Sequence, residues 1–217
     1  LRHNGVGAPE NTFNSNGAGT YSFATGVAIN PITGLPYTNN TGVWSFEWSI
    51  NSNFDTNGDV LKGFTYELGI DSDASQGTSF SVFDPINDAN ASAGGNVQWD
   101  HALGDNFTGQ SAGASISNST VNPGLYDSRI STLNLAQNSW KAHWFLTGFD
   151  PTVDGTYDFF LKAFDEFDNL VAHTNIQIIA GAGGAPVVPL PGAAALGFLG
   201  MGLIGLRRRF QKTHVVA

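Results

Sequence analysis

Two glutamates occupy matching positions in two alternating segments of this chain. Glu47 in "VWSFEWSI" (43–50) and Glu67 in "GFTYELGI" (63–70) both fall on the polar face of their segment. If the segments pair as a hairpin centred on Asn57, Glu47 stands opposite Glu67. Paired carboxylates on one sheet are the groups that glycosidases use. Because no aromatic side chain shares that face to hold a sugar, we favour solvated glutamates and keep the glycosidase as the alternative.

The loop between these segments carries candidate cation ligands. Asp55, Asn57 and Asp59 alternate in "DTNGD", and oxygen side chains at alternate positions beside a glycine can build a calcium site. The same residues are common turn formers, and no glutamate follows at EF-hand spacing. We therefore favour a turn and keep Ca²⁺ as the alternative. No other cofactor is indicated, since the five histidines are scattered and no glycine-rich phosphate loop opens a helix.

Four tryptophans fall in alternating segments. Trp44 and Trp48 share one face of 43–50, and Trp140 and Trp144 share one face of "SWKAHWFL" (139–146). Period-two spacing predicts that these side chains lie in the core of a sheet protein. A carbohydrate-binding platform is the alternative, because large aromatic rings provide stacking surfaces.

The elements that must position these residues are mostly strands. Alternating segments occur at 43–50, 63–70, 78–86, 139–146, 155–164 and 170–180, and the only plausible helix in the body is "YDSRISTLNLAQN" (126–138). Without crossover helices, six or more strands predict an all-β sandwich rather than an α/β sheet. Residues 1–19 and 87–124 are rich in Asn, Gly and Ser, and we expect them to be largely irregular.

The final pair of strands has a recognisable pattern. Asp154-Gly155-x-Tyr157 precedes a strand, an Asp168-Asn169 turn follows, and a return strand ends at Ala180. This arrangement resembles the last two strands of immunoglobulin-like sandwiches, in which a tyrosine corner begins the penultimate strand. The resemblance implies an immunoglobulin-like body.

Charge is scarce and unevenly distributed. Only 12% of the residues are charged, and all 18 acidic residues lie before residue 180 together with five basic ones, so that the body has a net charge of −13. Such a body repels nucleic acid and anionic surfaces, so we expect no nucleic-acid partner. Cysteine is absent, which excludes disulfides and thiolate sites. The chain begins at Leu1 without an apolar leader, which indicates either that a signal peptide has been removed or that the sequence is a fragment of a longer chain.

The C-terminal segment "VVPLPGAAALGFLGMGLIGLRRRF" (187–210) differs from the body. A Pro-x-Pro box precedes the uncharged run 192–206, and Arg207, Arg208 and Arg209 follow it. The twenty residues from Val187 would form a helix of about 30 Å, the thickness of a hydrocarbon core, and the arginines would remain on the cytoplasmic side. We predict a β-sandwich ectodomain (1–182), a Gly/Pro linker (183–191) and a single hydrophobic helix with a basic tail (192–217).

The tail resembles the PEP-CTERM sorting signal in its Val-Pro-Leu-Pro form, through Val188, Pro189, Leu190 and Pro191 and the arginine cluster. This resemblance implies processing by exosortase near the Pro-x-Pro box, a precursor in the bacterial inner membrane and a mature form at the cell surface or in the exopolysaccharide matrix. We expect an exported, non-enzymatic matrix protein, with extracellular polysaccharide as a partner. The alternatives are a plain single-pass anchor that bears a binding domain and a buried helix.

Overall fold

The computed structural model describes residues 2–3, 15–53, 57–87, 101–106, 114–116 and 123–186. The chain separates into two compact units, Leu1–Ala185 and Pro186–Ala217. The predicted hydrophobic helix at 192–208 lies outside the described residues. Within those residues, no helix is long and apolar enough to cross a membrane.

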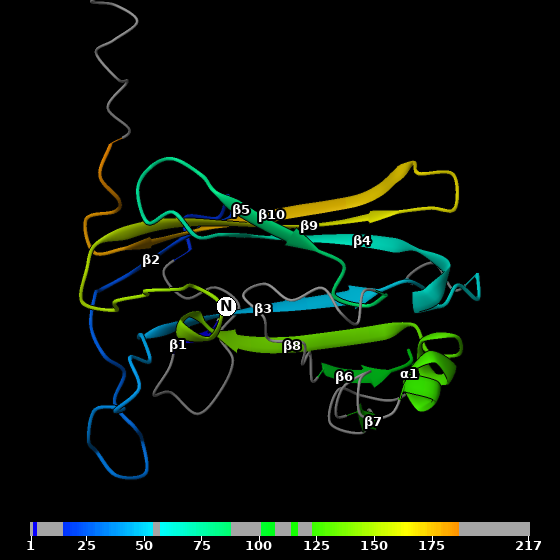
Figure 1. The fold of residues 1–217 in the computed structure, drawn as a ribbon, viewed down its shortest axis with the longest axis horizontal. Coiled ribbons are helices and arrows are strands. Elements are labelled where there is room, and N and C mark those ends of the chain that lie inside the picture. The colour runs from blue at the N-terminus through cyan, green and yellow to red at the C-terminus, as the bar shows by residue number, and fades with distance from the viewer. Residues whose placement is uncertain are drawn as a thin grey trace, which may run out of the picture. The chain divides into compact units, whose positions relative to one another are not determined.

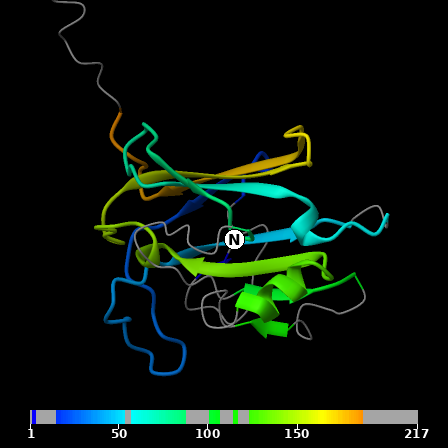
Figure 2. The same ribbon diagram turned by 45° about the vertical axis from the view of Figure 1, so that its right-hand side comes forward.

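Two five-stranded sheets form the body (Figures 1 and 2). The first sheet has the order β1-β3-β8-β6-β7, made of β1 (Arg2–His3), β3 (Trp44–Asn51), β8 (Leu135–Lys141), β6 (His101–Gly104) and β7 (Ala114–Ile116). The second has the order β2-β10-β9-β4-β5, made of β2 (Thr20–Phe23), β10 (Leu170–Ala180), β9 (Gly155–Phe164), β4 (Thr65–Asp71) and β5 (Phe80–Phe83). All neighbours are antiparallel except β2 and β10, which are parallel.

The core lies between the two sheets. Alternation along β3 buries Trp44, Phe46, Trp48 and Ile50, as the sequence predicts. The Phe46 ring stacks on that of Phe159 from the second sheet, with 4.5 Å between the ring centroids. Burial of each large apolar side chain contributes roughly 1.5–3 kcal/mol. The predicted all-β, two-sheet sandwich is confirmed.

The predicted hairpin between 43–50 and 63–70 is wrong. β3 pairs with β8 in the first sheet, and β4 pairs with β9 and β5 in the second. The connection between them crosses from one sheet to the other through the 3₁₀ helix η1 (Leu61–Gly63), where Leu61 is fully buried. β3 and β4 each carry a strongly apolar side, and these sides pack against each other across the core because the two strands lie in different sheets. Edge-to-edge pairing would have placed them side by side.

Two further local predictions are corrected. The helix α1 is Pro123–Ile130, so it begins before the predicted start and ends before Leu133. The segment after it enters β8, where pairing with β3 and β6 overrides local helix preference. The predicted strand at 139–146 ends at Lys141 and continues as the 3₁₀ helix η3 (Ala142–Trp144). The predicted final hairpin is confirmed with its bounds, 155–164 and 170–180.

Candidate functional site

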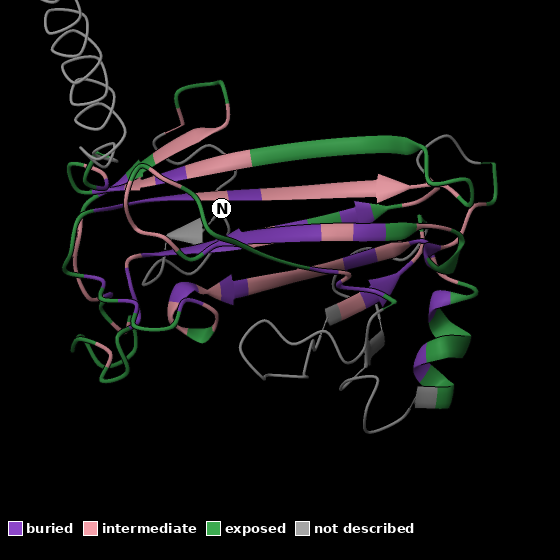
Figure 3. Cartoon of the chain, turned by 45° about the horizontal axis from the view of Figure 1, so that its top comes forward, coloured by how far each residue is buried: buried purple, intermediate pink, exposed green. Residues whose placement is uncertain are grey.

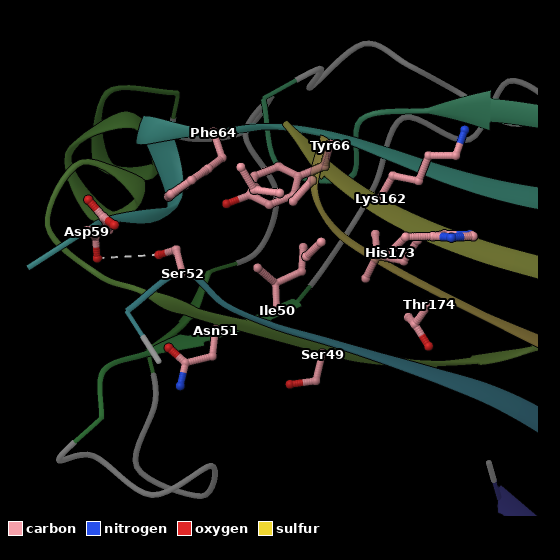
Figure 4. Close-up of a pocket in the computed structure, with 14 residues that line it drawn as sticks. Ser49, Ile50, Asn51, Ser52, Asp59, Phe64, Tyr66, Lys162, His173 and Thr174 are labelled. Carbon is pink, nitrogen blue, oxygen red and sulfur yellow. Dashed lines mark hydrogen bonds between the residues drawn. The ribbon is translucent and has the colours of Figure 1, made fainter. Parts of the chain in front are cut away.

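A groove runs along one side of the sandwich, between β3 of the first sheet and β10 of the second. Its larger part has a volume of about 600 Å³, and a smaller part of about 250 Å³ shares Ser49, Leu161 and Thr174 with it. We call both parts together the side groove. Figure 4 shows the larger part, with Ile50 and Tyr66 in its middle and Lys162, His173 and Thr174 towards one end.

The side groove has an apolar floor and a polar rim. Phe64, Tyr66 and Leu161 belong to the floor, and the Tyr66 hydroxyl donates a hydrogen bond to the Leu61 carbonyl oxygen at 2.9 Å. Burial and the nearby Asp84 raise the pKa of Tyr66, so this hydroxyl stays protonated. The rim residues carry hydroxyl, amide, imidazole and carboxylate groups: Ser49, Asn51, Ser52, Asp59, His173 and Thr174. Such a lining suits an extended, largely uncharged ligand.

The rim shows no catalytic arrangement among the described residues. The Ser52 hydroxyl donates to the carbonyl oxygens of Asp59 at 3.4 Å and Asn134 at 3.3 Å (Figure 4 draws the first). It therefore points at backbone acceptors, whereas an activated serine needs a neighbouring base. Lys162 Nζ lies 3.0 Å from Glu67 Oε2 and 4.6 Å from the centroid of the Phe160 ring.

The two candidate catalytic glutamates lie on different sheets. Glu47 stands opposite Ser139 on β8, and Glu67 stands opposite Lys162 on β9. Since the neighbours of each glutamate along its strand face the core, alternation turns Glu47 and Glu67 towards the outer faces of different sheets. Glu47 also lines the smaller part of the side groove, and Glu67 does not line either part. The predicted pairing of Glu47 with Glu67 across a hairpin is therefore wrong.

The acidic loop is organised as a turn where it is described. The Asn57 side-chain oxygen accepts a hydrogen bond from the Asp59 N–H at 3.2 Å, and Gly58 has the left-handed φ of 94°. Asp55 lies outside the described residues. No group of three or more His, Asp or Glu side chains able to hold a metal occurs in the described part of the chain.

Another pair of aspartates lies near the end of β4. Asp71 is fully buried, and its carboxylate accepts hydrogen bonds from the N–H groups of Asp73, Ser79 and Asp158. Asp73 in turn accepts a hydrogen bond from the Ser75 N–H at 2.8 Å. The carboxylates thus hold the connection to β5 in place. The partners of Asp71 come from the β4–β5 connection and from β9.

Trp44, Trp48 and Trp140 are buried, as predicted for a core, but Trp144 is 46% exposed. It forms a cluster with Tyr37 and Lys141, whose Nζ lies 4.9 Å from the Tyr37 ring centroid and 5.5 Å from that of Trp144. We call these three residues the Trp144 cluster. The neighbouring His143 has a buried Nδ1 without a hydrogen-bond partner, and burial together with Lys141 lowers the pKa of His143.

The sequence missed both the side groove and the Trp144 cluster. The groove depends on which strands lie at the sheet edges, and the cluster depends on a 3₁₀ turn that interrupts an alternating pattern. The predicted sorting residues, 188–191 and 207–209, lie outside the described residues. The chain matches no known protein family, no curated protein and no solved structure.

Proposed function

We propose that this protein is an exported, non-enzymatic component of the bacterial extracellular matrix, sorted through its C-terminal segment. The observation that carries the proposal is the order of three features in the sequence. These are the Val188–Pro191 box, the uncharged run 192–206 and the cluster Arg207–Arg209. Together they resemble the PEP-CTERM signal. The divergence of Glu47 and Glu67 onto opposite faces supports a role without glycoside hydrolysis.

Each part of the tail has a physical role in this proposal. Pro189 and Pro191 favour an extended box that is accessible to exosortase, because a helix on the N-terminal side of a proline cannot continue through it. The uncharged run holds the precursor in the inner membrane. The arginines stay on the cytoplasmic side. Cleavage near the box then releases the body to the cell surface or matrix.

The body is proposed to be an immunoglobulin-like sandwich. The order β1-β3-β8-β6 follows strands A, B, E and D of that fold, and β10-β9-β4-β5 follows G, F, C and C′. The chain passes through these strands in the same sequence as the fold requires. Such sandwiches serve many functions, so the architecture is compatible with a structural role but does not select one.

The Trp144 cluster is the proposed contact with polysaccharide. An exposed indole and a phenol ring beside an ammonium group offer apolar faces for sugar rings and a donor for their hydroxyl oxygens. No described residue of the body supplies a second exposed tryptophan. This contact needs no catalysis and fits a matrix protein.

The mass of the secreted protein tests the proposal. In a host with exosortase, we expect the mature form to lack everything after the Pro-x-Pro box, and intact-mass spectrometry measures this directly. Pro189→Ala with Pro191→Ala should keep the precursor in the inner membrane, whereas Pro186→Ala, outside the box, should not. A mature mass that still includes Arg207–Ala217 would mean a plain membrane anchor and would remove the sorting function.

A further inference from the structure

The residues that follow β10 are held against the body by backbone hydrogen bonds. The Gly181 N–H donates to the Phe23 carbonyl oxygen on β2 at 2.8 Å. Further along, the Gln76 N–H donates to the Ala185 carbonyl oxygen at 2.9 Å. These contacts lie at the end of the sandwich where β9 begins and β10 finishes, and both strands are most buried there (Figure 3). The first compact unit ends at Ala185, and we call 181–185 the strap.

Gly184 is the most enclosed residue of the strap. It is buried, and its N–H donates to the Thr156 hydroxyl oxygen on β9 at 2.9 Å. A Cβ at this position would overlap the Ala74 carbonyl oxygen and the Ser75 backbone in the β4–β5 connection. The Thr156 N–H donates to the same Ala74 oxygen at 3.1 Å. The strap, β9 and this connection therefore meet at Gly184, and any larger residue there would have to displace backbone.

The β4–β5 connection that the strap contacts is itself fixed. The buried Asp71 carboxylate accepts hydrogen bonds from the Asp73 N–H at 3.0 Å and the Ser79 N–H at 2.7 Å. A charged acceptor makes stronger hydrogen bonds than a neutral one. The connection therefore does not yield easily to a bulkier strap, and a substitution at Gly184 should displace the strap instead.

The composition of the strap alone would not reveal this arrangement. Its sequence, Gly-Ala-Gly-Gly-Ala, carries no charge and no large side chain, and such stretches are typical of flexible linkers. It lies just before the box that begins at Val188. A flexible linker is an easy target for proteases, because cleavage requires locally unfolded chain. The burial and the hydrogen bonds of the strap oppose local unfolding, so we expect proteases to engage the chain only beyond Ala185.

We propose that the strap sets the N-terminal limit of processing, by withholding 181–185 from proteases so that removal of the tail leaves the body intact. Gly184 and Thr156 act as positioning residues here, and they take no part in bond cleavage. The role in a host rests on the proposed cleavage near the Pro-x-Pro box. The protection of the strap, in contrast, is a property of the body alone and can be measured without exosortase.

Limited proteolysis of the full-length chain in mild detergent tests the protection. After digestion with a protease of broad specificity, mass spectrometry should find that the C-terminal peptide of the resistant body ends at or beyond Ala185. Gly184→Ala displaces the strap and Thr156→Val removes its hydroxyl acceptor, so each should admit cleavage within 181–185 about tenfold faster. Gly63→Ala is the matched control, because a Cβ there meets no atom within 4 Å, and it should be cleaved like the wild type.

Circular dichroism verifies that the three variants are folded. A wild-type body trimmed to a point before Gly181, or wild-type cleavage rates in both strap variants, would overturn the proposal. In a host with exosortase, the wild-type mature form should end beyond Ala185, and Gly184→Ala should add shorter forms that end within 181–185. A single Gly184→Ala product of wild-type length would overturn the processing limit. A mature form that keeps Arg207–Ala217 would remove the sorting function, whereas the digestion would still decide the protection of the strap.

Discussion

At the scale of single residues, the role of a polar side chain depends on the partner that the fold places beside it, and the sequence does not name that partner. Glu67 looks like half of a catalytic pair until β9 places Lys162 beside it. Asn57 looks like a cation ligand until its side-chain oxygen is seen to accept the Asp59 N–H. In both cases the observed partner satisfies the polar group, so the simpler of the two interpretations is the better supported one.

Asp158 gives a prediction at this scale. Burial raises its pKa, a hydrogen bond from Gln177 partly opposes the rise, and the adjacent Asp71 adds to it. A raised carboxyl pKa means that the folded state binds the proton more tightly, so stability falls as the pH rises through the folded-state pKa. Asp158→Asn should therefore raise Tm at pH 7, and the gain should shrink as the pH falls through the raised pKa of the wild-type carboxyl.

The control for this experiment is Asp165→Asn, which should change Tm in the opposite direction. Hydrogen bonds from Asn169 and Phe167 lower the pKa of Asp165 in the β9–β10 turn, so its charge stabilises the folded state above the unfolded pKa. Asp165→Asn should lower Tm at pH 7. Thermal melts of both variants across pH 4–8 decide the matter. A lower Tm for Asp158→Asn at pH 7 would contradict the assigned cause.

At the scale of elements, the transition from β8 to η3 shows where alternation fails. Trp140, Ala142, Trp144 and Leu146 alternate as a strand would, yet the chain turns after Lys141. Ala142 and Leu146 remain buried, whereas Trp144 emerges at the surface. A 3₁₀ turn advances three residues per turn, so it breaks the period of two and brings one aromatic ring outside.

This turn predicts the effect of changing Trp144. Trp144→Ala should reduce binding to the host exopolysaccharide about tenfold through loss of one stacking surface, with little change in Tm because the indole is 46% exposed. Affinity electrophoresis in gels that contain the polysaccharide measures this. Phe167→Ala removes another exposed ring, 75% exposed in the β9–β10 turn, and is the matched control. Equal mobility shifts in both variants would exclude a specific role for Trp144.

At the scale of the whole molecule, calcium should have no effect on stability. An ion bound only to the folded state at a hundredfold excess over Kd would add about 2.7 kcal/mol. The side-chain oxygens of Asn57 and Asp73 already accept hydrogen bonds from the backbone N–H groups of Asp59 and Ser75. We therefore expect the same Tm in EDTA and in millimolar calcium. A clear rise with calcium, lost in Asp59→Asn, would instead establish the alternative site at Asp55, Asn57 and Asp59.

The sequence by itself determined the strand-rich class, the core tryptophans of β3 and the bounds of the last hairpin, because side-chain alternation and turn residues are local properties. Only the tertiary structure decided which strands share a sheet. The pairing observed places Glu47 and Glu67 on different sheets and forms the side groove between β3 and β10. Alternation states which face of a strand is buried, but it carries no information about the neighbour at its edge. That neighbour is chosen by packing between segments far apart in the chain.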